Sequence, residues 1–408
     1  MSNYPIGLSV EEGLSKLLEV AGHRKIEKVP PSRAHNRVLA EDIVATESIP
    51  PFPRSPYDGY AFRADDIKYA TKENPVTLEI IEEIPAGHAA TKEVGEGQAV
   101  KILTGAPVPK GADTIEKFEV TEFTDSKVTF FAPVIKGNNI VPEGEDVKIG
   151  EVVLEKGTII TAAGCGILAG LGQMNVPVYE EITASVISTG DELIEVSEAL
   201  SPGKLRNSSA YTIKALMESW GINVYLRGIV KDDPQLIAEA VREECEHADV
   251  VITTGGVSVG DYDCLQSAME ILSADVLFWK LKMKPGSAFL ASVYKDTPII
   301  SLSGNPSAAI IALMLIGKPT LLKMTGRTDY MTEEFLVKLE ADFPKKSMVR
   351  RFIPGCIKII NGEAYLRAMS KQSNGMLSPL TGVDILGEIP EGTPEVPAGT
   401  VIKAYKLY

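Results

Sequence analysis

The chain has 408 residues, 44% hydrophobic and 24% charged, which is typical of a globular protein too long for one ordinary domain. Its net charge of −14 and pI near 5.0 argue against general binding of nucleic acid or anionic membranes, so an anionic ligand would need a local basic patch. The four cysteines and four histidines lack metal-ligand spacing, which argues against a zinc or iron–sulfur site. Because no leader-like start and no run of about 20 apolar residues is found, a cytoplasmic protein is expected.

Two helices and an extended connector are expected near the N-terminus. Residues 9–22 place apolar side chains on one helical face behind Ser9 as a candidate N-cap, and residues 32–43 resemble a second helix. Segment 49–56 contains four prolines, which remove backbone donors and fix φ. This segment is therefore predicted to be an extended connector.

The remainder alternates between β-rich and α/β patterns. Short strands with Gly and Pro turns predict a small β-rich domain at about 75–135. The Gly-rich stretch 161–172 predicts a helix whose small residues allow close packing, either within the subunit or at a subunit contact. Between 182 and 325, apolar strands alternate with helices such as 233–247, which predicts a parallel sheet covered on both faces. From 335 onward, short strands predict a final β-barrel or sandwich.

Turn-forming residues follow three expected strands of the α/β region, where ligands bind in doubly wound sheets. The segments are STGDEL (188–193), TTGGVSVGDYD (253–263) and SLSGNPSAA (301–309). Gly255, Gly256 and Gly260 can aim successive N–H groups at one point, and Ser258 adds a hydroxyl, which suits a phosphate. Pro306 suits the first turn of a helix whose N–H groups would face an anion. One such turn would more often be structural, but two at neighbouring strand ends favour a binding site.

A lysine-rich strand is expected at 278–287. Period-2 alternation places Lys280, Lys282 and Lys284 on one face and apolar residues on the other. Three like charges on one face repel each other, so they are either solvated or balanced by an anion. The Pro-Gly turn and apolar segment that follow favour the anion.

Carboxylates lie in the same group of loops, namely Asp191, Glu192, Asp232, Asp233, Asp261 and Asp263. Each alone is more often a turn former or helix cap. Together, facing a phosphate cradle, they would repel the ligand unless a hard cation such as Mg²⁺ lies between them. The cluster therefore predicts a metal held jointly by protein and substrate.

Five motifs in the same order along the chain carry a resemblance to a known family. They are SPYDGYA (55–61), ILTGAPVPKGADTI (102–115), EGEDV (143–147), STGDEL (188–193) and TGGVSVGDYD (254–263). In this order they resemble the molybdopterin molybdenumtransferase family, which includes one domain of gephyrin, nearly from end to end. TGGVSVG alone is shared with molybdopterin adenylyltransferases, so the N-terminal motifs distinguish the two families.

The resemblance implies a multidomain α/β plus β protein, with a doubly wound α/β molybdopterin-binding domain, an inserted β domain, an elongated N-terminal domain and a C-terminal β barrel. The expected ranges are 1–50 and 145–180 for the elongated domain, 51–144 for the inserted domain, 181–327 for the α/β domain and 328–408 for the barrel. A homodimer with a shared site is also implied, as is transient contact with an adenylyltransferase.

The resemblance further implies that molybdate and adenylylated molybdopterin are the substrates and that AMP is released. By motif match, Asp58, Thr104 and Asp146 would reach in from the second subunit, whereas the α/β domain would contribute Glu192, Asp232, Asp263, Lys280 and Lys284. Glu192 and Asp263 would hold Mg²⁺. Pterin and phosphate would be bound by Gly255, Gly256, Ser258, Gly260, Ser303, Gly304, Asn305, Pro306 and Ser378.

Several positions depart from the family pattern. Ser287 stands where many members carry a further lysine, and Ser209 stands where asparagine is usual. An arginine is expected near 350, where both Arg350 and Arg351 are available. Two alternative functions remain: adenylyl transfer from ATP to molybdopterin by the same α/β domain, and a non-catalytic scaffold that binds a pterin or a peptide.

Overall fold

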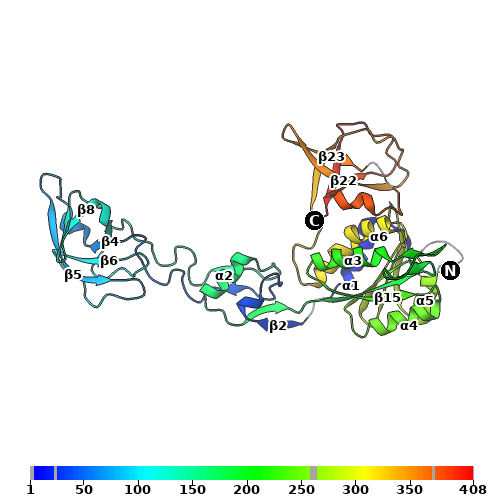
Figure 1. Ribbon diagram of the computed structural model, residues 1–408, viewed down its shortest axis with the longest axis horizontal. Coiled ribbons are helices and arrows are strands. Elements are labelled where there is room, and N and C mark those ends of the chain that lie inside the picture. The colour runs from blue at the N-terminus through cyan, green and yellow to red at the C-terminus, as the bar shows by residue number, and fades with distance from the viewer. Residues whose placement is uncertain (1–3, 23–24, 258–263, 370–372, 408) are drawn as a thin grey trace.

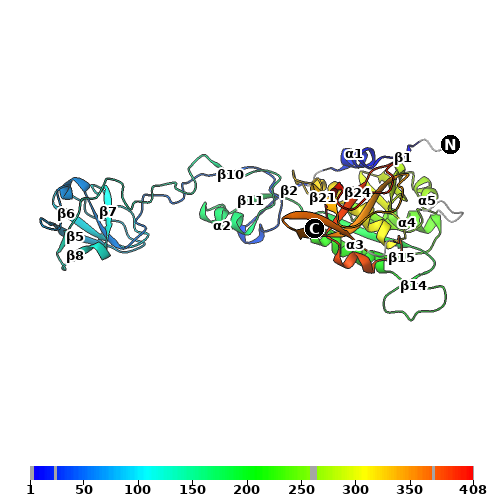
Figure 2. The same cartoon turned by 90° about the horizontal axis from the view of Figure 1, so that it is seen from above.

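The protein is elongated, with two compact units joined by a slender one. The computed structural model describes residues 4–22, 25–257, 264–369 and 373–407. The α/β unit and the C-terminal barrel lie at one end, and the small β unit lies at the other (Figures 1 and 2). Mixed sheets, helices and a closed barrel confirm the expected multidomain α/β plus β class.

The α/β unit is built on a seven-stranded sheet of order β1-β17-β19-β20-β16-β12-β15. The strands are β1 (Ile6–Leu8), β12 (Thr183–Thr189), β15 (Asn223–Val230), β16 (Val250–Thr254), β17 (Asp275–Leu281), β19 (Phe289–Tyr294) and β20 (Thr297–Leu302). Only β19 runs against its neighbours; every other pairing in the sheet is parallel. The carboxyl ends of the parallel strands therefore meet at one edge, which is where the Gly-rich turns follow β12, β16 and β20.

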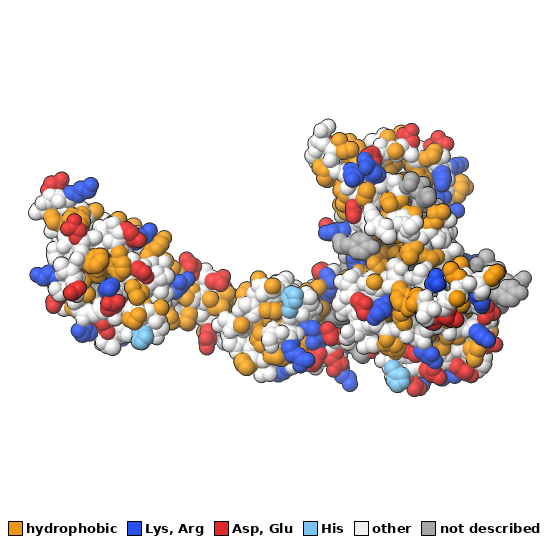
Figure 3. Space-filling view, in the orientation of Figure 1, with side chains coloured by type: hydrophobic (Ala, Val, Ile, Leu, Met, Phe, Trp, Pro, Cys, Tyr) orange, Lys and Arg blue, Asp and Glu red, His pale blue; other side chains and the backbone are white. Residues whose placement is uncertain are grey.

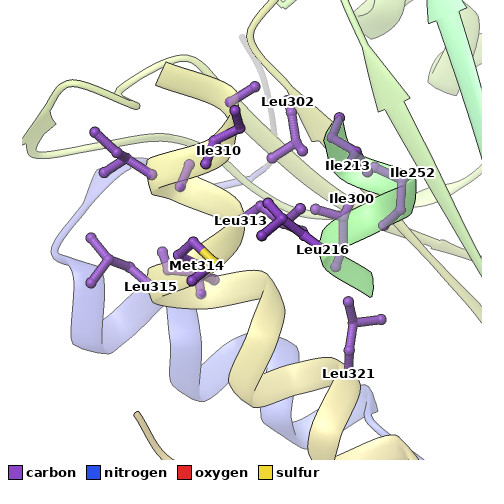
Figure 4. Packing of buried hydrophobic residues seen from close by; sticks show 14 of the residues in the cluster. Ile213, Leu216, Ile252, Ile300, Leu302, Ile310, Leu313, Met314, Leu315 and Leu321 are labelled. Carbon is purple, nitrogen blue, oxygen red and sulfur yellow. The ribbon is translucent and has the colours of Figure 1, made fainter. Parts of the chain in front are cut away.

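Helices cover both faces of this sheet. One face carries α1 (Val10–Val20), α3 (Ser208–Ser219), α6 (Pro306–Ala312), η4 (Leu313–Gly317) and α7 (Lys318–Met324). Figure 4 shows the apolar side chains of the sheet, α3 and the long helix filling the space between them. The other face carries α4 (Pro234–Glu244), capped by Asp233, and α5 (Cys264–Leu272). The central strands β12, β16 and β20 are buried on both sides, which explains their near-continuous apolar content.

Helix Pro306–Met324 is long and apolar enough, by length and composition, to cross a membrane. However, 89% of its apolar window is buried inside the protein. It is therefore the central helix of the α/β core.

Helix α1 begins as expected but belongs to a different unit. Ser9 accepts a hydrogen bond from the Glu12 N–H, and the Glu12 carboxylate accepts one from the Ser9 N–H in return, which forms a capping box. Strand β1 pairs with β17, and α1 packs into the core of the α/β unit. Residues 6–20 thus lie in the α/β unit, which corrects the assignment of the whole range 1–50 to the elongated domain.

The elongated unit contains β2 (Ile26–Val29), η1 (Pro31–Arg33), β3 (Ile43–Val44), β10 (Val152–Leu154), α2 (Ala162–Gly170) and β11 (Val176–Tyr179). The helix expected at 32–43 was wrong. Only η1 forms, and the chain then runs extended, because the Leu39 and Ala40 N–H groups donate to carbonyls of Thr158 and Pro177. Tertiary backbone pairing outweighs the helical periodicity there.

The small β unit is a six-stranded sheet of order β7-β4-β6-β5-β9-β8. It comprises β4 (Gly59–Phe62), η2 (Ala64–Ile67), β5 (Val76–Ile84), β6 (Gln98–Ile102), β7 (Thr114–Lys117), η3 (Phe118–Val120), β8 (Thr121–Phe123) and β9 (Lys127–Phe130). Two antiparallel segments join it to the elongated unit, with the Arg54 N–H donating to Val141 and the Ile49 N–H to Val147. The proline-rich connector is therefore extended, as expected.

The C-terminal barrel closes through pairing of β22 with both β23 and β24. Its elements are β21 (Glu334–Leu339), β22 (Arg350–Ile360), β23 (Glu363–Ala368), η5 (Ser378–Gly382), β24 (Ile385–Ile389) and β25 (Val401–Lys406). Strand β18 (Met283–Lys284) leaves the α/β unit to pair with β22. This pairing ties the barrel to the lysine-rich segment.

A partly buried ion pair also joins the barrel to α1. The Arg350 guanidinium donates to both Glu388 carboxylate oxygens, each at 2.8 Å, and also contacts Glu11 of α1. The Tyr405 hydroxyl donates to Glu388 at 2.6 Å. Burial favours a higher pKa for Glu388, but the hydrogen bonds from Arg350 and Tyr405 hold that pKa below its ordinary value.

We expect Arg350→Met to lower the free energy of unfolding by about 2 kcal/mol, because it leaves the partly buried Glu388 carboxylate without its cationic partner. Urea unfolding of the full chain measures this. The double variant Arg350→Met/Glu388→Gln should recover part of the loss, and a double variant as unstable as the single one would contradict the ion-pair explanation. Because the folded pKa of Glu388 lies below its unfolded value, the contribution is present at neutral pH and is lost as the pH falls below about 4.5.

Candidate active site

A cavity of about 1060 Å³ lies at the carboxyl edge of the α/β sheet. Its walls are the loops after β12, β16 and β20, the lysine-rich segment after β17, and two pieces of the barrel around Val349 and Asn374. The sequence-predicted residues that line it are Glu192, Asp232, Gly255, Gly256, Lys280, Lys284, Ser303, Gly304, Asn305 and Pro306. Residues far apart in the sequence are therefore brought to one cavity.

The first Gly-rich turn is packed tightly against the end of β12. Gly255 and Gly256 have φ values of 108° and 62°, which residues with a Cβ rarely adopt. A Cβ on Gly255 would lie 2.1 Å from the Thr189 carbonyl oxygen, so only glycine fits. Ser258 and Gly260 lie outside the described residues, so the structure places only the first half of the predicted phosphate cradle.

The second turn, after β20, contacts the barrel. Asn305 precedes α6, its N–H donates to the Ser303 hydroxyl at 3.2 Å, and Pro306 is the first residue of the helix. The Ser307 N–H donates to the Asn374 carbonyl of the barrel at 3.0 Å. Ser378 begins η5 shortly after this contact but is not among the residues that line the cavity.

Three lysines reach the cavity, although not on a regular strand as expected. Lys280 has a φ of 66°, and this break in the pleat lets Phe278 and Leu281, three residues apart, pack into the same core. Lys280, Lys282 and Lys284 all line the cavity. None of the three forms an ion pair with a described side chain. The segment thus concentrates positive charge on one wall.

Carboxylates lie near the end of β12 and in the loop after β15. The Asp191 N–H donates to the Asp232 carboxylate at 3.3 Å, and Glu192 also lines the cavity. Burial raises the pKa of Asp232; the Asp191 N–H opposes this, whereas the Glu192 and Asp191 carboxylates raise it further. Asp263 lies outside the described residues. Within the described ranges no three acidic, His or Cys side chains form a metal-binding cluster.

The predicted residues of the inserted domain form a separate group. The Asp58 carboxylate accepts hydrogen bonds from the Thr104 N–H at 2.7 Å and from its hydroxyl at 2.8 Å. These bonds, the backbone one first, hold the pKa of Asp58 below its ordinary value although the side chain is exposed. Asp146 lies in the two antiparallel segments that join the small β unit to the elongated unit, where its N–H donates to the Ile49 carbonyl. The small β unit and the cavity are at opposite ends of one chain (Figure 1).

Several lining residues were not predicted from the sequence. Asn207, 4% exposed, caps α3 and accepts from the Ser188 hydroxyl at 3.1 Å; its place before a helical segment could have indicated it. Arg206 and Asn374 carry no comparable signal. Neither arginine near 350 lines the cavity, because Arg350 is held by Glu388 and only the preceding Val349 reaches the wall.

We expect Gly255→Ala to destabilise the chain by more than about 1 kcal/mol, since both its φ and its contact with Thr189 exclude a side chain. Gly304→Ala is the matched control, because a Cβ there meets nothing closer than 3.4 Å. Thermal denaturation compares the two. Equal stability of both variants would contradict the tight turn.

We expect the pKa of the Asp58 carboxyl to be low and to rise in Thr104→Val, which removes the hydroxyl donor but keeps the backbone one. Carboxyl carbon NMR titration measures both values. Thr129→Val is a control in the same unit, because its hydroxyl bonds only Thr77. An Asp58 pKa unaffected by the Thr104 change would show that the side-chain hydrogen bond does not form.

Comparisons with known proteins agree along the whole chain. Residues 8–172 match the MoeA N-terminal region (domain I and II), residues 185–323 a probable molybdopterin binding domain, and residues 337–407 the MoeA C-terminal region (domain IV). The chain is 35% identical over 395 residues to the molybdopterin molybdenumtransferase of Staphylococcus aureus strain COL, covering 97% of this chain and 94% of that protein. It is 36% identical over 404 residues to that of Bacillus subtilis strain 168, covering 97% and 93%.

Solved structures give the same result. A molybdopterin biosynthesis moeA protein from Pyrococcus horikoshii OT3 superposes with a TM-score of 0.83 at 34% identity, covering 98% of this chain and 100% of that one. The chain therefore belongs to the molybdopterin molybdenumtransferase family of molybdenum cofactor biosynthesis, which confirms the resemblance drawn from its motifs.

Proposed function

We propose that this chain inserts molybdate into adenylylated molybdopterin and releases AMP. One observation carries the proposal: three lysines without an ion-pair partner among the described side chains line the same cavity of about 1060 Å³ as a Gly-rich turn. Molybdate and the phosphoanhydride are both anionic, and each needs positive charge and N–H donors in a chain of net charge −14. The cavity volume suits a ligand that contains both a pterin and a nucleotide.

The roles of the residues follow from their positions. Lys280 and Lys284 would bind molybdate and phosphate oxygens, and the N–H groups after β16 and β20 would face the anhydride. Two Mo–S bonds form as one molybdate oxo group leaves with the two thiol protons as water, and attack on the molybdopterin phosphorus breaks the anhydride bond, with AMP as the leaving group. No covalent protein nucleophile is required, because molybdate oxygen or water can attack phosphorus once its charge is neutralised.

Magnesium belongs to the same proposal. Glu192 and Asp263 would hold it, with Asp232 nearby and the substrate phosphates as further ligands. The raised pKa of Asp232 fits, because it reflects burial and carboxylate repulsion that a cation would relieve. When bound, Mg²⁺ would neutralise charge on the phosphates.

The active site would be shared between two copies of the chain. Asp58 and Thr104 form an exposed pair far from the cavity of their own chain, which supports a second chain bringing them to its cavity. Asp146 would join them from the segments that connect the small β unit to the elongated unit. Helix α2 offers a contact surface, because Ala162, Ala163 and Gly166 are exposed there. Contact with an adenylyltransferase and a cytoplasmic setting stay predictions.

The first test is AMP release from adenylylated molybdopterin with molybdate and Mg²⁺. We expect release to depend on molybdate, and Lys284→Met to reduce its rate by about 100-fold, because a cation at the reacting anion is lost. Lys358→Met, on β22 and outside the cavity, is the control. Consumption of ATP in place of the adenylylated substrate would indicate the adenylyltransferase alternative, and pterin binding without turnover would indicate a scaffold.

A second test addresses the shared site. Asp58→Asn and Lys284→Met should each be nearly inactive alone, at about one hundredth of the wild-type rate or less. After mixing and subunit exchange, half of the dimers are hybrids with one intact site of two, so about one quarter of wild-type activity should return. Mixing Lys284→Met with Glu192→Gln is the control and should restore nothing, since both changes lie on the same side of the site. No recovery in the first mixture, with hybrids demonstrated, would contradict a shared site.

A further inference from the structure

Trp279 lies beside the cavity and has an unusual environment. Its ring packs against the same apolar cluster as Ala288, which lines the cavity, and the neighbouring Lys280 lines the cavity as well. Its indole Nε1 is buried and has no hydrogen-bond partner among the described residues. Burying an unpaired donor is unfavourable, so a phenylalanine would fill this position at lower cost if packing were its only role.

The ring contacts a charged neighbour that a regular strand would direct elsewhere. Successive side chains of a strand point to opposite faces, so Trp279 and Lys280 should diverge. Instead, the left-handed backbone of Lys280, with φ of 66°, brings its Nζ to 4.0 Å from the centroid of the Trp279 ring. Residues with a Cβ rarely adopt this backbone, and such conformations gather at functional sites.

Among the described lysines of the cavity, only Lys280 has such a partner. Neither Lys282 nor Lys284 lies over an aromatic ring. A free lysine has many rotamers, and ordering it when a ligand binds costs conformational entropy. Tryptophan presents the most favourable aromatic face to an ammonium group. Contact with the ring on one side leaves the remaining N–H groups of Lys280 available to a ligand.

We propose that Trp279 is a positioning residue that holds the Lys280 ammonium at the cavity wall before an oxyanion binds. This inference rests on the proposed function for the identity of the oxyanion, molybdate. It assigns Trp279 no contact with the substrate, since the ring acts through Lys280. Oxyanion affinity should therefore depend on the aromatic face, although stability should not.

The experiment measures molybdate binding by equilibrium dialysis, with pyrophosphate as a second oxyanion. Trp279→Phe should weaken binding about two- to five-fold, and Trp279→Leu should weaken it further, with unchanged or higher thermal stability for Trp279→Phe. In a Lys280→Met background, Trp279→Phe should have no added effect, because the residue through which it acts is gone. Additive losses in the two backgrounds would overturn the proposal.

Fluorescence gives a readout that a packing role would not change. The chain has two tryptophans, so Trp220→Phe leaves Trp279 as the only indole. Trp220 is also a matched control, since it lies under Lys318 at 5.7 Å and outside this cavity. Molybdate should alter Trp279 emission in Trp220→Phe, and Lys280→Met should abolish the change.

The outcomes separate the two proposals. If AMP release fails but oxyanion binding follows Trp279 as described, the proposed function is wrong and the positioning role stands. If AMP release succeeds while Trp279→Phe binds molybdate as tightly as wild type, the positioning role is wrong. A wild-type chain that binds neither oxyanion would also overturn it, because Lys280 would then have no ligand to meet.

Discussion

Repulsion between an anionic ligand and a chain of net charge −14 is the constraint on which the candidate site depends. Charges of both signs are intermixed over the face in Figure 3, so the local balance matters more than the total. At the carboxyl edge of the sheet the balance is reversed by Lys280, Lys282 and Lys284, none of which forms an ion pair with a described carboxylate. Opposite them, Glu192 and Asp232 supply acidic groups that suit a cation.

Three kinds of contact hold these opposed charges in place: a close-packed turn, strand pairing and an ion pair between domains. The Gly255 turn packs so closely against the end of β12 that a side chain on Gly255 would strike the Thr189 carbonyl. The lysine segment is fixed at both ends, since β17 belongs to the central sheet and β18 pairs with the barrel. The Arg350–Glu388 pair and its contact with α1 fasten the barrel to the α/β unit. Site geometry is thus coupled to packing between domains.

Local sequence patterns predicted the alternation of strands and helices in the α/β unit, the Ser9 cap and the strand-end turns. They could do so because apolar periodicity and turn chemistry are properties of short segments. The helix expected at 32–43 failed because its backbone pairs with residues more than a hundred positions away. Similarly, β1 joins a strand that the sequence places far from it. The roles of Asn207 and Arg350 depend on which neighbours reach them in space. The left-handed Lys280 was missed because its backbone is set by packing of Phe278 and Leu281.

The most direct measurement is a crystal structure with molybdate and AMP bound, using anomalous scattering at the molybdenum absorption edge to locate the metal. We expect a molybdenum peak whose oxo groups lie within hydrogen-bonding reach of Lys280 and Lys284. The AMP phosphate should lie over the Gly255–Gly256 turn, and Asp58 of a second copy should face it. A molybdenum peak elsewhere on the chain, with this cavity empty, would contradict the account.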